Sequence, residues 1–97
     1  MQLSQFRASL EGDTPPDTLS LPVLALWYLA KGDWEEAHRK AQDDKGNDGA
    51  WVHAHLHRVE GDLSNAAYWY RRAGKEASSL PLDKEWDEIA TALLEQS

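Results

Sequence analysis

Three histidines stand at alternate positions in the stretch AWVHAHLHRVEG, residues 50–61: His53, His55 and His57. On a β-strand all three imidazoles would point to the same side, where they could bind one metal ion. On an α-helix His53 and His57 lie one turn apart, and His55 faces nearly the opposite way. The chemistry of this stretch therefore depends on the element that carries it.

The helical alternative leaves His53 and His57 as a pair at i and i+4, with Glu60 three residues further along. Alanine follows the first histidine, so the H-E-x-x-H pattern of zinc peptidases is absent. A tight zinc site needs three or four ligands, and the chain has no cysteine to supply one. We expect a buried histidine pair that is satisfied by Tyr68, Tyr70 or backbone carbonyls. A metal site made of His53, His57 and Glu60 is the weaker alternative.

No other segment carries a recognisable catalytic pattern. The run DDKGNDG, residues 43–49, contains acidic side chains but lacks the spacing and the closing glutamate of an EF-hand. Its GNDG portion is too short for a phosphate-binding loop and has no lysine after it. No nucleophile stands beside a local base. We therefore predict a protein that is not an enzyme and uses no cofactor.

Composition and charge narrow the class of partner. The chain has 97 residues, the length of one domain, and a net charge of −7 at pH 7, which repels phosphate backbones and argues against nucleic acid. No apolar run approaches the ~20 residues of a membrane-spanning helix. The first residues lack the basic and apolar regions of a secretory signal. We expect a cytoplasmic protein that binds neither nucleic acid nor a membrane.

Turn-forming residues divide the chain into segments of helical length. The turns lie at residues 11–18, 31–34, 43–49, 60–63 and 73–81. The segment 19–31 is apolar nearly all round and rich in leucine and alanine, which favours a buried helix.

The remaining segments carry helix signals of their own. Asp33 and Asp62 stand where an N-cap is needed, and Glu36 has the spacing to complete a capping box with Asp33. Apolar residues of the last segment fall on one helical face: Leu82, Trp86, Ile89 and Leu93. The chain is predicted to be all-α.

The Gly-Asp turn occurs twice at a fixed offset. Gly32 and Gly61 are 61 − 32 = 29 residues apart, and the same offset pairs Asp33 with Asp62. Alanines repeat with it, at 25 and 54 and again at 37 and 66. A fixed period of this size is typical of stacked helical hairpins, in which small residues allow the two helices to approach closely.

The second unit contains the pattern G-D-x-x-x-A-x-x-x-Y-x-x-A, from Gly61 to Ala73, and the first unit has Leu24, Ala25 and Tyr28 before its Gly-Asp turn. These motifs resemble tetratricopeptide repeats, and AAYWYRRAG resembles the ending of the related Sel1-like repeats. The resemblance covers about residues 19–75, with a period of 29 to 30 residues where the family has 34.

The resemblance implies one α-helical repeat domain, residues 1–97. Its expected parts are an N-terminal segment (1–18), a first hairpin (19–43), a second hairpin (48–74) and a C-terminal capping helix (80–96). In such repeats the positions of His53 and His57 face the interior of the hairpin. The stretch with three histidines would then be a helix, and its histidines would divide between two environments.

The resemblance also implies a binding surface. Trp51, His55 and Arg58 would line the concave groove at i, i+4 and i+7, where arginine could bind a carboxylate and tryptophan could supply contact area. The predicted function is protein or peptide binding, with another protein or with a second copy of the chain. The alternative is a small-ligand or metal-dependent protein whose ligand site comprises His53, His57, Tyr68 and Arg71.

Overall fold

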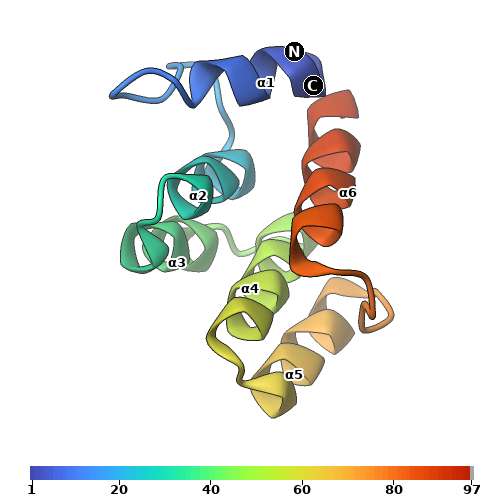
Figure 1. Ribbon diagram of the computed structural model, residues 1–97. Helices are drawn as coiled ribbons and strands as arrows, with labels where there is room; N and C mark the ends of the chain where they lie inside the picture. Colours follow the sequence, from blue (N-terminus) through green and yellow to red (C-terminus); the bar gives the residue numbers. More distant parts are fainter. Residues whose placement is uncertain (97) are drawn as a thin grey trace.

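The computed structural model describes residues 1–96 and is all-α (Figure 1). No strand is found among these residues, which confirms the predicted class. The helices are α1 (Leu3–Ser9), α2 (Leu21–Ala30), α3 (Trp34–Asp43), α4 (Asn47–Glu60), α5 (Leu63–Ala73) and α6 (Leu82–Glu95). Within the described residues, none of the helices has the length and apolarity needed to span a bilayer.

Two hairpins, α2–α3 and α4–α5, are closed by turns with the same local geometry. Gly32 and Gly61 both have a φ of 86°, a left-handed conformation that glycine adopts without steric cost. In each turn the glycine amide donates to the carbonyl three residues back at 3.0 Å, and the aspartate amide donates to the carbonyl five residues back at 2.9 Å. The sequence offset of 29 residues therefore corresponds to a repeated backbone structure.

The aspartates that follow these glycines cap the second helix of each hairpin, as predicted. Asp33 and Asp62 each accept a hydrogen bond from the backbone amide three residues on, at 3.1 and 3.2 Å. Glu36 does not complete a capping box. Its carboxylate pairs instead with Arg39 and Lys40 on the same helix.

The two hairpins are joined by a close approach at Gly49. The predicted turn extended through residue 49, but α4 already begins at Asn47, so the last residues of the run GNDG are helical. A side chain at Gly49 would place its Cβ 2.6 Å from the carbonyl oxygen of Asp44 and 2.8 Å from the Cβ of that residue. The end of α3 and the start of α4 can approach this closely only because position 49 has no side chain.

Helix α4 is the centre of the molecule. Its residues from Gly49 to His57 are all buried, and it packs against α2, α3, α5 and α6. A helix that is buried on every side has no solvent face on which polar residues can be placed. Two of its histidines, His53 and His57, therefore contact rings of α3, and the third, His55, contacts Glu85 of α6.

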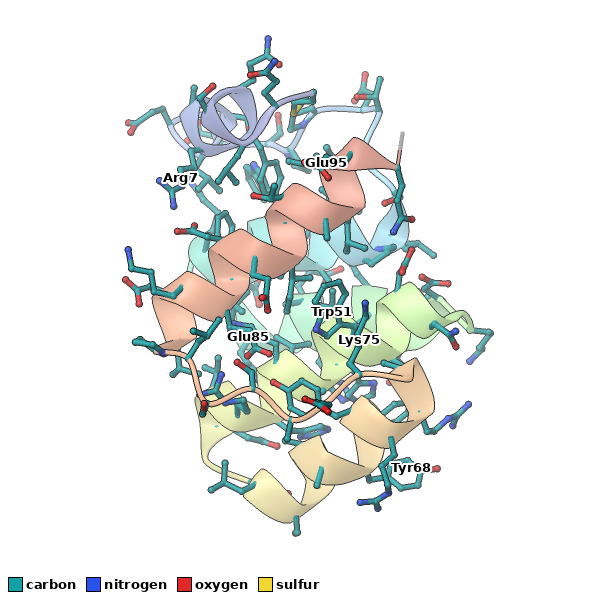
Figure 2. The ribbon with its side chains drawn as sticks, turned by 90° about the vertical axis from the view of Figure 1, so that its right-hand side faces the viewer. Arg7, Trp51, Tyr68, Lys75, Glu85 and Glu95 are labelled. Carbon is teal, nitrogen blue, oxygen red and sulfur yellow. The ribbon has the colours of Figure 1, made fainter. Side chains whose placement is uncertain are left out.

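Helix α6 covers the first helices of both hairpins. It packs against α1, α2 and α4 (Figures 1 and 2), whereas in the described chain it contacts α5 through side chains, by a hydrogen bond from Tyr70 to Glu85. Trp86 holds it in place by donating from its indole nitrogen to the carbonyl of Leu26 at 3.1 Å and by stacking on Phe6 at a centroid distance of 5.5 Å. A helix therefore forms within the predicted segment 80–96, and it lies across α2 and α4.

Candidate functional site

A buried carboxylate links α6 to the second hairpin. Glu85 has no exposed surface, and its Oε1 lies 2.7 Å from both the Nδ1 of His55 and a guanidinium nitrogen of Arg58. The hydroxyl of Tyr70 donates to the other carboxylate oxygen, Oε2. An ionised carboxylate is stable in a protein interior only when its oxygens are satisfied in this way.

These contacts shift the pKa values of the buried acids. Burial alone would raise the pKa of Glu85, but the hydrogen bonds from His55, Tyr70 and Arg58 together hold that pKa below its ordinary value of 4.5. Burial and the neighbouring carboxylate raise the pKa of Tyr70. Glu85 is therefore charged at neutral pH, and Tyr70 keeps its proton as a hydrogen-bond donor.

The predicted groove stripe of Trp51, His55 and Arg58 is covered by the chain itself. Trp51 is 7% exposed and His55 is 1% exposed, and Arg58 is held by Glu85 and by the carbonyl of Leu80 at 2.7 Å. The ammonium group of Lys75 lies over the ring of Trp51 (Figure 2) at 4.3 Å from its centroid. The three side chains do not form an open surface, because α6 and the segment before it lie across them. The carboxylate expected from a partner is supplied by Glu85.

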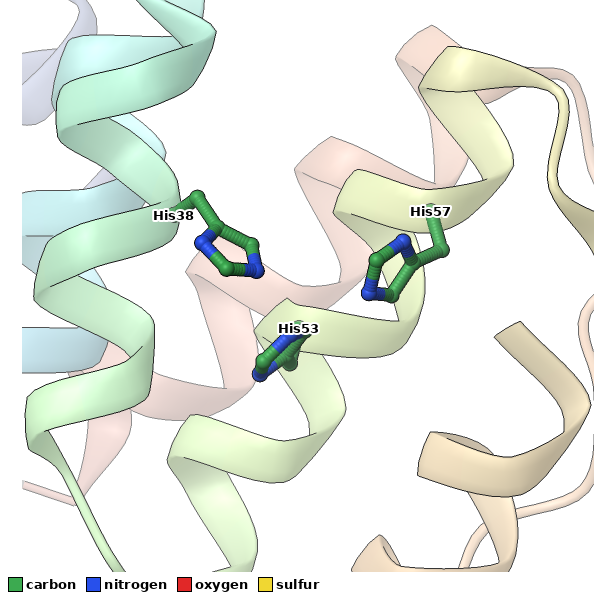
Figure 3. A group of neighbouring side chains, drawn as sticks. All are labelled: His38, His53 and His57. Carbon is green, nitrogen blue, oxygen red and sulfur yellow. The ribbon is translucent and has the colours of Figure 1, made fainter. Parts of the chain in front are cut away.

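A second cluster of polar side chains lies between α3 and α4. It consists of His38, His53 and His57, whose rings gather in the space between these helices (Figure 3). One ring nitrogen from each of the three lies within 4.8 Å of those of the other two. The i, i+4 pair of α4 was predicted to face the interior, and both members are buried, at 4% and 6% exposed.

Tryptophans orient the rings of this histidine cluster. Trp69 of α5 stacks on His53 with a centroid distance of 3.8 Å and an interplanar angle of 10°. Trp34 stacks on His38 at 5.0 Å and 14°, and its indole nitrogen is fixed by a 2.9 Å hydrogen bond to the carbonyl of Leu56. Each stacking partner restricts the rotation of one imidazole.

The hydrogen bonds of the cluster differ from those expected. Nδ1 of His57 lies 2.5 Å from Oε1 of Glu60, and neither Tyr68 nor a backbone carbonyl bonds to the histidine pair in the described chain. The other proposed donor, Tyr70, is bonded to Glu85. The expectation that tyrosines or backbone carbonyls form hydrogen bonds with the histidine pair is therefore wrong. The carboxylate of Glu60, one turn away on the same helix, forms the hydrogen bond with His57 instead.

The remaining imidazoles favour the neutral form. No hydrogen bond to the ring nitrogens of His38 or His53 is present among residues 1–96. Burial, followed by repulsion from His38 and His57, lowers the pKa of His53 from 6.5 to about 4. Burial also lowers the pKa of His38. At neutral pH both rings therefore keep a free nitrogen lone pair.

The alternative ligand site, which joined Tyr68 and Arg71 to the histidines, is not assembled. Tyr68 is 45% exposed at the outer face of α5 (Figure 2), and Arg71 is exposed as well. Their neighbours Trp69 and Arg72 take the expected place. Trp69 stacks on His53, and the guanidinium of Arg72 lies 5.1 Å from the centroid of the Trp69 ring.

An open pocket of about 570 Å³ lies where α1, α2, α4 and α6 meet. Its wall is largely apolar, and it includes Leu29, Val59, Leu82 and Trp86. Val59 and Leu82 are 38% and 39% exposed, so apolar surface continues to the rim. The charged residues of the rim are Arg7, Glu11, Asp83 and Asp87, of which Arg7 and Asp87 form an ion pair.

Two site residues, His38 and Glu85, were not predicted from the sequence. Trp34 and His38 stand at i and i+4 on α3, which was the available signal for a ring pair facing the next hairpin. Glu85 falls among apolar residues of α6, between Leu82 and Ile89, and an acidic residue on that side of a helix needs a partner. Neither signal indicates which helix the residue contacts in the folded chain.

Comparison with known proteins found no matching family model, no matching curated protein and no matching solved structure.

Proposed function

We propose that this chain is a non-enzymatic module that binds a basic, amphipathic helical segment of another protein in the apolar pocket between α1, α2, α4 and α6. The observation that carries the proposal is the combination of an apolar wall with an acidic rim. The wall continues to exposed Val59 and Leu82, and Glu11 and Asp83 stand beside it. Exposed apolar surface rimmed by polar groups is typical of interaction sites.

The shape and charge of the pocket favour a helix over other occupants. The volume lies within the range of ligand sites, but the pocket is open to solvent and would leave much of a small molecule exposed. An apolar stripe at i, i+3 and i+7 can be inserted into such a groove. Because the chain carries a net charge of −7, a second copy would bring like charge to the acidic rim, whereas lysines would be attracted to it.

We further propose that the hairpins form a tetratricopeptide-like array. Support comes from the two identical Gly-Asp turns and from the packing of α2, α3, α4 and α5 in sequence order. On this proposal α6 lies in the concave side of the array, where a ligand of such repeats would be expected. The pocket beside α6 is then the part of that side that stays open.

Two synthetic helical peptides test the binding proposal. Both carry the same leucine stripe, but one is rich in lysine and the other in glutamate on its polar face. Fluorescence anisotropy with the full chain at low salt should show at least tenfold tighter binding of the lysine-rich peptide. Val59→Arg and Leu82→Arg should weaken that binding at least tenfold, because each places a cation at the apolar rim.

Tyr68→Arg is the matched control, since it makes a similar change at an exposed aromatic residue on the outer face of α5. It should leave the affinity unchanged. Equal affinity for the two peptides, or equal loss with Tyr68→Arg and Val59→Arg, would refute the proposed docking surface.

A further inference from the structure

We propose that His38, His53 and His57 form a binding site for a divalent transition metal ion, with zinc as the ion that the ligand set fits best. The site lies between α3 and α4. It is separate from the peptide pocket, since none of the three histidines lines that pocket. The two proposals can therefore fail independently.

The distances among the three imidazoles are close to those of a metal site. One nitrogen from each ring lies within 4.8 Å of the other two. In a tetrahedral zinc site with Zn–N bonds of 2.0 to 2.1 Å, ligand nitrogens are about 3.3 Å apart. Each nitrogen–nitrogen distance would need to shorten by roughly 1.5 Å at most, and small rotations of the side chains can produce this change. Three imidazoles suit zinc, whereas calcium and magnesium prefer oxygen ligands.

The scaffold restricts the ligands to a small region. His53 and His57 stand one turn apart on α4, the most buried helix, and His38 projects from the adjacent α3. Trp69 stacks on the ring of His53, and Trp34 stacks on the ring of His38. Rings that are already confined lose less freedom when a metal binds.

A carboxylate forms a hydrogen bond with one of the three histidines, His57. Oε1 of Glu60 lies 2.5 Å from Nδ1 of His57. Because a carboxylate accepts hydrogen bonds, Nδ1 carries the proton, and the lone pair of Nε2 is free to bind a metal ion. Metal-bound histidines in proteins commonly donate their other N–H to a carboxylate in this way. The free nitrogens of His38 and His53 have no competing hydrogen bond among residues 1–96.

The surroundings leave room for a further ligand. His53 lines a cavity of about 190 Å³ that extends between the end of α3 and α5, with Arg72 among its lining residues. Zinc held by three protein ligands keeps a coordination position for water or an anion. Arg72 would favour an anion over a second cation at that position.

Zinc titration of the full chain after treatment with EDTA tests the site. Isothermal titration calorimetry should show one zinc ion per chain, and cobalt(II) should give the visible absorption of tetrahedral coordination. His38→Gln should raise the Kd at least 100-fold. This residue is only partly buried, so its replacement is the least disruptive of the three. Glu60→Gln should raise the Kd about tenfold, because it removes only the supporting carboxylate.

His55→Gln is the matched control, since it replaces the remaining histidine, which lies on the same helix but bonds to Glu85. It should leave the zinc affinity unchanged. In the unaltered chain, the ring signals of His38, His53 and His57 should shift on zinc addition in NMR spectra, and those of His55 should not, which gives an answer even if a variant fails to fold.

Three results would overturn the site. One is the absence of zinc binding at one equivalent by the unaltered chain. Another is equal loss of affinity with His55→Gln and His38→Gln. The third is binding that survives His38→Gln but is abolished by Glu60→Gln, which would place the ion on the second group of neighbouring ligands, His57, Glu60 and Asp62.

Discussion

At the residue scale, Glu85 is the side chain on which the contact between α6 and the second hairpin depends. It is completely buried and accepts hydrogen bonds from His55, Arg58 and Tyr70. The sequence identified the basic half of this group, because His55 and Arg58 were predicted to bind a carboxylate. It could not identify the acid, which lies 30 residues from His55 and meets it only through tertiary packing.

Replacement of Glu85 should be costly. Glu85→Gln removes the charge that compensates Arg58 and turns one acceptor oxygen into a donor that faces other donors. Breaking a buried charge pair typically costs about 3 to 5 kcal/mol, so we expect the free energy of unfolding to fall by about 3 kcal/mol in urea titrations. Glu88→Gln on the exposed side of α6 is the control and should change stability by less than about 0.5 kcal/mol. Equal effects of the two replacements would contradict the role of Glu85.

The same carboxylate makes a specific contribution to acid sensitivity. Its pKa is lowered in the folded chain, because the hydrogen bonds from its partners outweigh the effect of burial. Between the ordinary value of 4.5 and that lower pKa, the unfolded chain binds a proton that the folded chain does not. The contribution is therefore complete above pH 4.5 and is lost as the pH falls through the folded-state pKa. Urea titrations at a series of pH values should show a shallower decline below pH 4.5 in Glu85→Gln than in the unaltered chain. Parallel declines would contradict this account.

At the element scale, local sequence signals account for most of the helices and turns. Asp33 and Asp62 cap the helices that they were predicted to cap, and glycine occupies the left-handed position of both hairpin turns. These features depend on residues within one turn of each other. The face that each helix buries depends on its neighbours, which is why the contact of His38 with α4 and the path of α6 were not predicted.

The junction between the hairpins gives a test of packing at this scale. Gly49→Ala should lower the free energy of unfolding by about 1 to 3 kcal/mol, because the added methyl group would lie 2.6 Å from the carbonyl oxygen of Asp44. Gly12→Ala is the control, since its nearest contact would be an ordinary 3.5 Å. Thermal melts followed by circular dichroism would compare the two variants. A melting temperature for Gly49→Ala that equals or exceeds that of Gly12→Ala would show that α3 and α4 do not approach this closely.

At the scale of the whole molecule, α6 determines which surfaces are open. It covers the first helices of both hairpins, including the stripe that was predicted to bind a partner, and leaves the apolar pocket beside α1. The histidine cluster lies apart from this surface, between α3 and α4. Composition indicated an acidic domain, and the turn and cap signals indicated that it is helical. The covered stripe, the open pocket and the histidine cluster follow only from the packing of α6 and α3 on α4.

The most direct test of the proposed function is to map the contact surface of the lysine-rich peptide on the full chain by NMR. The account predicts chemical-shift changes at the methyl groups of Leu29, Val59 and Leu82 and at the indole of Trp86, with none at Tyr68. Changes centred on the outer face of α5, or no changes even at a large excess of the peptide, would contradict it.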